Sequence, residues 1–164
     1  MVKTINFLFV TMFGVGKLPK IPGSYASLIT VIFLYILFQI LSVPAEFFLF
    51  FLVGVFFVSL FSINYFVKDY QNKDPKEVVI DEFIGQSIPI CLYEISHTEP
   101  TSPARVMTFY FIMFILFRIF DIAKPYPVSY YDKNFKNSFG VIMDDVCAGL
   151  YVVAILVLYM IITT

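Results

Sequence analysis

Charged residues are the scarcest class in this sequence. They make up 14% of the 164 residues, whereas hydrophobic residues make up 60% and aromatic residues 20%. A water-soluble domain is typically about one-quarter charged and about half apolar, so the composition excludes an ordinary soluble fold and favours a protein that lies in lipid. The length predicts a single integral membrane domain, residues 1–164, with four to six spans.

Other scarce features exclude further classes of protein. The net charge is only −1, so no broad basic surface is available for nucleic acid. The two cysteines, Cys91 and Cys147, form no CxxC or metal-type spacing and are predicted to be inert core thiols. There is no internal repeat, and no feature specifies an oligomeric state. The apolar segment Ile5–Phe13 lacks a small-residue cleavage pattern, so we expect no cleaved signal peptide.

Apolar runs predict an all-α membrane helical bundle. Residues 1–13 are too short to span and are expected in the interface or as a re-entrant segment. A fifth, weaker span is predicted over 83–96, in a helix beginning near Glu77, although Gln86, Ser87 and Pro89 interrupt it and Pro89 is expected to kink it. The four clear runs are Ala26–Leu41, Phe47–Ile63, Val106–Phe120 and Cys147–Ile162.

The distribution of basic residues favours five spans over four. With five spans, only Arg105 lies on the side of the membrane opposite the amino terminus. With four spans, four basic residues lie on that side. Because basic residues concentrate on the cytoplasmic side of membrane proteins, we expect a cytoplasmic amino end and an external carboxyl end. The ten residues on the amino-terminal side are Lys3, Lys17, Lys20, Lys68, Lys73, Lys76, Arg118, Lys124, Lys133 and Lys136.

Two segments at helix ends carry polar chemistry. Residues 14–27 read GVGKLPKIPGSYAS, which predicts an ordered loop that either cradles phosphate or is a plain juxtamembrane loop. Arg118, Asp121 and Lys124 are spaced three apart, so they share one face of a helix that Pro125 ends. This charged stripe is either an interfacial anchor or the wall of an active site. The following segment, 126–143, is predicted to be a polar-aromatic loop.

Acidic residues gather at one predicted rim. Clustered carboxylates repel one another unless a cation joins them, and hard oxygen ligands suit magnesium. Basic side chains on the same rim suit phosphoryl oxygens. Structural alternatives remain open: Asp144 and Asp145 as helix-capping acids, Asp81 and Glu82 as interfacial acids, and Asp132 as a solvated side chain. The acids of this rim are Asp81, Glu82, Asp121, Asp132, Asp144 and Asp145.

The sequence lacks the residues that several known phosphatase mechanisms require. The only histidine, His97, falls in a turn predicted on the far side, so the rim holds neither a histidine nucleophile nor a Ser-His-Asp triad. Neither cysteine is followed by Arg at the sixth position, and no DxDx[TV] motif occurs. The remaining mechanism is metal-activated water that attacks a phosphomonoester, with carboxylates as ligands and base.

Four ordered blocks resemble the phosphatidylglycerophosphatase A family. They read GVGKLPKIPGSYASL (14–28), VVIDEFIG (78–85), FRIFDIAKPYPV (117–128) and GVIMDDVCAG (140–149). The resemblance implies a magnesium-dependent membrane phosphatase of the bacterial inner membrane, which hydrolyses phosphatidylglycerophosphate on the cytoplasmic face. The chain departs from the family at Ser24, Ala26 and Asn137–Ser138, where the family usually has Thr, Gly and a pair of glycines.

The residues and the resemblance together define the expected site. Metal ligands are expected to be Asp81, Glu82, Asp121, Asp144 and Asp145, and one of Asp81, Glu82, Asp121 and Asp145 is expected to act as the base. The terminal phosphate is expected to be bound by Lys17, Ser24, Arg118 and Lys124. A phosphatase for another lipid monoester, such as phosphatidate, and a small membrane cation transporter are the alternatives. No acid lies in the middle of a predicted span, which argues against the transporter.

Overall fold

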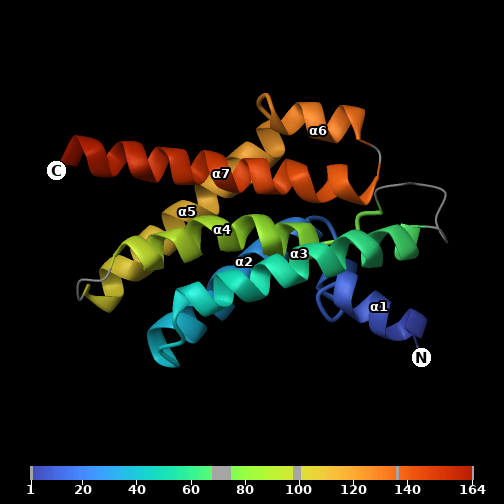
Figure 1. The fold of residues 1–164 in the computed structure, drawn as a ribbon, viewed down its shortest axis with the longest axis horizontal. Helices are drawn as coiled ribbons and strands as arrows, with labels where there is room; N and C mark the ends of the chain where they lie inside the picture. Colours follow the sequence, from blue (N-terminus) through green and yellow to red (C-terminus); the bar gives the residue numbers. More distant parts are fainter. Residues whose placement is uncertain (1, 68–74, 98–100, 136, 164) are drawn as a thin grey trace.

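The computed structural model describes residues 2–67, 75–97, 101–135 and 137–163, and every regular element in them is helical. This confirms the predicted all-α class. Short helices flank five long ones (Figure 1). The elements are α1 Val2–Val10, the 3-10 turn η1 Val15–Lys17, α2 Pro22–Tyr35, the π-helical segment η2 Ile36–Ile40, α3 Ala45–Val67, α4 Ile80–Ser96, α5 Pro103–Ala123, α6 Val128–Asn134 and α7 Ser138–Thr163.

Four of these helical stretches are long and apolar enough to cross a membrane. They are Pro22–Ile40, Ala45–Val67, Pro103–Ala123 and Ser138–Ile162. The fifth long helix, α4, has 17 residues, carries two acids in its first turn and continues through Pro89. It runs roughly alongside α3 and α7, and the start of α1 and the end of α7 lie at opposite ends of the bundle (Figure 1).

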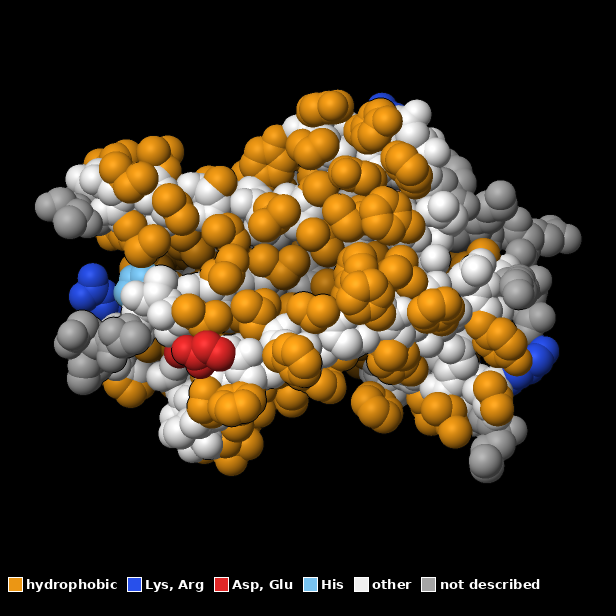
Figure 2. Space-filling view, viewed as in Figure 1, with side chains coloured by type: hydrophobic (Ala, Val, Ile, Leu, Met, Phe, Trp, Pro, Cys, Tyr) orange, Lys and Arg blue, Asp and Glu red, His pale blue; other side chains and the backbone are white. Residues whose placement is uncertain are grey.

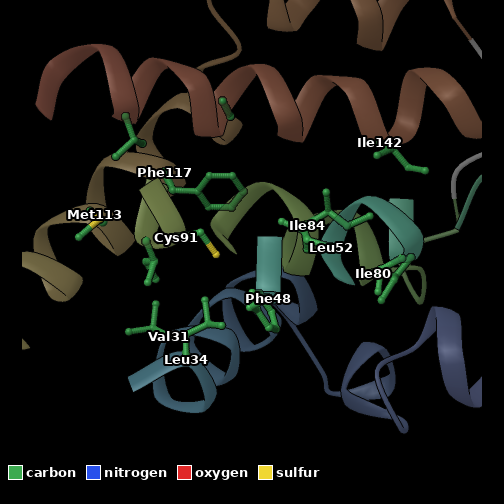
Figure 3. Close-up of a cluster of buried hydrophobic side chains, with 14 of the residues drawn as sticks. Val31, Leu34, Phe48, Leu52, Ile80, Ile84, Cys91, Met113, Phe117 and Ile142 are labelled. Carbon is green, nitrogen blue, oxygen red and sulfur yellow. The ribbon is translucent and has the colours of Figure 1, made fainter. Parts of the chain in front are cut away.

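Helix α4 is the centre of the bundle. It packs against α7, α2, α3 and α5, and Ile84 and Ile90 on it are almost completely buried. Figure 3 shows Ile84 and Cys91 of α4 among apolar side chains from α2, α3, α5 and α7, including Phe117. A helix that is buried on several sides needs less apolar length than a lipid-facing span, which accounts for its polar residues.

Many large hydrophobic side chains are exposed on the outside of the bundle. Phe50 and Phe61 on α3 are 82% and 76% exposed. Figure 2 shows a broad hydrophobic face that an acidic patch interrupts toward one end. Apolar side chains of this size on the outside of a long helix are expected to face lipid rather than water.

Helix ends follow local sequence signals. Pro22 and Pro103 occupy the first turns of α2 and α5, where the missing N–H costs nothing. Lys124, with φ 45°, closes α5 in the left-handed conformation directly before Pro125. The predicted helix stop at Pro125 is therefore confirmed.

Several predicted boundaries are wrong. The segment 126–143 is not a loop, because it contains α6 and the first turns of α7. The last span begins at Ser138 rather than Cys147, and Asn137 caps it by accepting the Gly140 N–H at 3.0 Å. The predicted loop over 14–27 ends early, because Pro22 already starts α2. Lys68, Lys73 and Lys136 lie outside the described residues.

Candidate active site

A polar cavity of about 260 Å³ opens at the end of the bundle where α4 and α7 begin and α5 ends. Carboxylates and lysines from five separate segments line it. Segments far apart in the chain are therefore brought together, as the rim hypothesis predicted. The lining residues are Lys20, Pro22, Gly23, Lys76, Val78, Asp81, Glu82, Asp121, Lys124, Asp132, Phe135, Gly140, Val141, Asp144 and Asp145.

Three carboxylates form the centre of this cavity. Asp81, Glu82 and Asp145 each offer an oxygen atom, and these atoms lie within 4.8 Å of one another. Asp81 and Asp145 are 8% and 3% exposed. Carboxylates this close and this buried are costly without a cation between them. The arrangement therefore suits a divalent metal ion.

Two glycines allow the two acidic helices to approach each other. A Cβ on Gly85 of α4 would lie 2.6 Å from the carbonyl oxygen of Asp145 and 2.8 Å from the Phe117 ring. A Cβ on Gly149 of α7 would collide with the backbone of Gly85. Side chains at either position would force α4 and α7 apart. The close contact therefore keeps Asp145 next to the acids of α4.

Glu82 fills the space between α4 and α2. Its Oε1 lies where a side chain at Gly23 would have to go, and its Oε2 is buried and makes no hydrogen bond. A buried carboxylate oxygen without a hydrogen-bond donor is destabilising unless a ligand or an ion contacts it. Glu82 is thus a member of the cluster with an open position for a metal ion.

Asp121 is held by Arg118 rather than by the carboxylate cluster. The Arg118 Nη1 donates to Asp121 Oδ2 at 2.7 Å, one turn along α5, and both side chains are 15% exposed. The same nitrogen lies 3.4 Å from the Ser27 hydroxyl oxygen, and the Arg118 Nε is buried without a partner. Arg118 and Asp121 share a face of α5 as predicted, and Asp121 lines the cavity, whereas Lys124 follows the helix end in the left-handed conformation.

Lys124 joins three elements at the cavity. Its ammonium group donates to Asp132 of α6 at 2.6 Å and to Asp144 of α7 at 2.9 Å. Burial lowers the pKa of Lys124, but the hydrogen bonds and negative charges of Asp132 and Asp144 outweigh burial and hold its pKa above the usual range. Lys124 therefore stays protonated, and Asp132 is a member of the site rather than a freely solvated acid.

Asp144 and Asp145 occupy the interior of α7, more than one turn beyond its start at Ser138. The reading of these acids as first-turn caps is therefore wrong, and the Asn137 cap explains why. The Asp145 N–H donates to Asp144 Oδ1 at 3.0 Å. Adjacent positions on the helix let Asp144 face Lys124 while Asp145 faces α4.

Three of the four predicted phosphate-binding residues are absent from the cavity lining: Lys17, Ser24 and Arg118, whose guanidinium bonds Asp121. The Lys17 ammonium sits 4.6 Å from the centre of the Phe7 ring and lines a different cavity, together with Lys3. Ser24 is half-buried in the first turn of α2 and is absent from the lining. Sequence reasoning missed Lys20 and Lys76, which are exposed and line the acidic cavity. Lys20 lies in the predicted loop, but only the fold shows which of its lysines turns toward the acids.

The fold and this cavity define an all-helical protein with four candidate membrane spans and a carboxylate-rich site suited to a divalent cation and a phosphate group. The model of the phosphatidylglycerophosphatase A family matches residues 8–160. The chain therefore belongs to this family of phosphoric monoester hydrolases, and the resemblance of the four blocks is confirmed.

Curated relatives cover most of the chain. It is 32% identical over 148 residues to phosphatidylglycerophosphatase A of Haemophilus influenzae, covering 90% of this chain and 84% of that protein. The Escherichia coli phosphatidylglycerophosphatase A is 28% identical over 153 residues, covering 91% and 80%. A Bacteroides thetaiotaomicron protein named "Putative phosphatidylinositol-3-phosphatase" is 33% identical over 148 residues, covering 88% and 86%. No solved structure matches the chain significantly.

Proposed function

We propose that this protein hydrolyses phosphatidylglycerophosphate to phosphatidylglycerol and phosphate, with Mg²⁺ as its cofactor. The observation that carries the proposal is the Asp81–Glu82–Asp145 cluster in a cavity that also presents lysine side chains. Family membership supports a phosphomonoester substrate. The hydrophobic exterior supports a substrate whose acyl chains stay in the bilayer while its phosphate reaches the cavity.

The residues present fit a magnesium ion. Its preferred ligands are carboxylate oxygens together with water and substrate phosphate, and the unpartnered Glu82 Oε2 offers one such position. Asp81, Glu82 and Asp145 would hold the ion. Asp121 and Asp144 remain in the proposed ligand set because they line the same cavity, each beside a cationic partner. When bound, Mg²⁺ supplies a Lewis acid that activates water and offsets phosphoryl charge.

The chain's own residues perform the remaining steps. Lys20 and Lys76 bind the oxygens of the phosphate as it enters, and Arg118 and Lys124 lie deeper beside the carboxylates. One carboxylate of the cluster takes a proton from the attacking water, whose oxygen forms the new bond to phosphorus. The bond between phosphorus and the lipid oxygen breaks, and the lipid leaves as an alcohol after it gains a proton.

We also propose five membrane crossings, with α4 as the fifth. The opposite placement of the two chain ends supports an odd number of crossings (Figure 1). The excess of basic residues on the amino-terminal side supports a cavity that faces the cytoplasm at a bacterial inner membrane. The shortness of α4 fits a helix that other helices surround.

Another lipid monoester is the second candidate substrate. The Bacteroides relative, named for a phosphoinositide, is as similar to this chain as the relatives named for phosphatidylglycerophosphate. The phosphate-binding machinery would be common to both substrates, so the difference would lie in the headgroup.

A substrate panel tests the proposal. Purified protein in mixed micelles is assayed for phosphate release from phosphatidylglycerophosphate, phosphatidate and phosphatidylinositol 3-phosphate, each with Mg²⁺ and with EDTA. We expect the highest kcat/KM on phosphatidylglycerophosphate, and loss of release in EDTA. A higher kcat/KM on another monoester would overturn the substrate, and full activity in EDTA would overturn the cofactor.

A further inference from the structure

A second polar site lies at the other end of α4, about 18 Å along the helix axis from Glu82. The Glu94 carboxylate accepts a hydrogen bond from the Tyr110 hydroxyl at 2.8 Å and another from the Gln39 amide at 3.0 Å. Each bond uses a different oxygen, so each oxygen keeps a further acceptor position. Three helical elements thus converge on one carboxylate that can still accept a donor.

The π-helical segment Ile36–Ile40 contains one of these partners. Gln39 lies in it, and π-helical turns often occur at functional sites. A cavity of about 310 Å³ adjoins the carboxylate, with Tyr93 and His97 among its walls. Glu94 is the only acidic residue in its described lining, and no lysine or arginine lines it. The cavity is therefore suited to a single cationic group.

An apolar groove of about 320 Å³ lies next to this cavity. The two share Tyr93 and His97, whose rings stack 4.2 Å apart. The groove lies between α4, α5 and α7, and its described lining contains no lysine, arginine or carboxylate. Such a groove beside a charged cavity matches a molecule with a cationic head and an apolar tail. The groove is lined by Pro89, Leu92, Tyr93, Ile95, Ser96, His97, Phe109, Val153, Leu156, Val157, Tyr159 and Met160.

A positive charge lies at the rim of the groove. Arg105 is exposed, and its guanidinium is 6.0 Å from the centre of the Phe109 ring, which lines the groove. The Phe109 ring also packs against Tyr93, with ring centres 5.3 Å apart, and Tyr93 lines the same cavity as Glu94, so the two charges belong to one neighbourhood. A ligand that spans this neighbourhood would place a cation at Glu94 and an anion at Arg105.

We propose that this end of the protein binds a zwitterionic phospholipid with a primary ammonium headgroup. The ammonium donates hydrogen bonds to the free acceptor positions of Glu94, the phosphate pairs with Arg105, and one acyl chain lies in the groove. An anionic headgroup offers no cation to Glu94, and a quaternary ammonium cannot donate a hydrogen bond. The site is separate from the acidic cavity and does not depend on the proposed phosphatase reaction.

Native mass spectrometry of the delipidated full-length protein tests this site. Phosphatidylethanolamine, phosphatidylcholine and phosphatidylglycerol with identical acyl chains are titrated separately, and the affinity of each is measured. We expect phosphatidylethanolamine to bind tightest. Glu94→Gln should weaken phosphatidylethanolamine about tenfold, the scale of a charge-assisted hydrogen bond, and should leave phosphatidylglycerol unchanged. Glu46→Gln removes an exposed acid from the first turn of α3 and is the matched control.

The headgroup preference separates a ligand site from a purely structural hydrogen-bonded contact. If Glu94→Gln lowers the melting temperature but keeps the wild-type preference, Glu94 only joins helices and the proposal is overturned. Equal binding of all three lipids by the wild type, or an equal loss in Glu46→Gln, overturns it as well. Arg105→Gln alters an exposed side chain and is not expected to disturb folding. It should weaken phosphatidylethanolamine severalfold, and an unchanged affinity would remove the phosphate contact on which the proposal rests.

Discussion

Gly85 on α4 faces the carbonyl oxygen of Asp145 on α7 so closely that a Cβ would lie 2.6 Å from that oxygen. The contact fixes the distance between two helices that are about 60 residues apart in the chain. It also places Asp145 within 4.8 Å of the Asp81 and Glu82 oxygens. The geometry of the carboxylate cluster therefore depends on a residue that carries no chemistry itself.

Gly85→Ala should separate α4 from α7 and disturb the cluster. Overpacking of this kind typically costs about 1–3 kcal/mol of unfolding free energy, and we expect phosphatase activity to fall by about tenfold or more. Gly54→Ala is the control, because nothing lies within 4 Å of a Cβ there. It should keep full activity and gain up to about 1 kcal/mol. Equal activity in the two variants would show that the helix contact does not set the site.

Glu82→Gln should weaken divalent metal binding. The substitution keeps the shape of the side chain and removes the charge of the residue whose Oε2 lacks a partner. Electron paramagnetic resonance of Mn²⁺, used as a probe for the Mg²⁺ site, should show at least about tenfold weaker binding. The same measurement on Glu46→Gln, an exposed acid outside the cavity, should match the wild type. Wild-type affinity in Glu82→Gln would place the ion elsewhere.

Arg118→Lys should reduce kcat/KM although it keeps the positive charge. Arg118 bonds Asp121 at 2.7 Å and approaches Ser27 at 3.4 Å, and a lysine ammonium cannot reproduce the planar geometry of the guanidinium. We expect a loss of about tenfold, measured by steady-state phosphate release. Arg105→Lys makes the same exchange at the far end of the bundle and should have no effect. Equal kinetics for both variants would contradict a role of Arg118 in the site.

Lys124→Met should lower both activity and stability. The change leaves Asp132 and Asp144 without their shared cation. Because the Lys124 side chain is 31% exposed, solvent screens the pair, and we expect only about 1 kcal/mol of lost stability in chemical denaturation. Lys133→Met, on the exposed side of α6, should be neutral. A Lys124→Met protein as stable as Lys133→Met would show that these contacts contribute nothing to the fold.

The sequence predicted the chemistry of the site better than its geometry. Acids at helix ends and the Arg118–Asp121–Lys124 stripe were recognisable because helical spacing is local. The pairing of Lys124 with Asp132 was not, since it depends on α6, a short helix within an apparently polar loop. Asp144 and Asp145 resembled cap residues because no local signal favours Asn137 over them as the start of α7.

The fold was likewise only partly predictable from the sequence. Long apolar runs identified the four candidate membrane spans, because lipid contact requires an apolar exterior. Helix α4 was harder to recognise, since burial among other helices lets it carry Gln86 and Ser87 without facing lipid. Lys20 and Lys17 are three residues apart in one loop, yet only Lys20 lines the cavity. The direction in which a loop side chain points depends on the packed structure.

Phosphate release by Asp145→Asn tests the central claim most directly. Asp145 is 3% exposed and belongs to the cluster proposed to hold Mg²⁺ and supply the base. Purified wild type and Asp145→Asn are compared on phosphatidylglycerophosphate with saturating Mg²⁺, after circular dichroism has shown equal helicity. We expect kcat to fall by about 10²–10⁴-fold. A folded Asp145→Asn protein with wild-type kcat would contradict that claim.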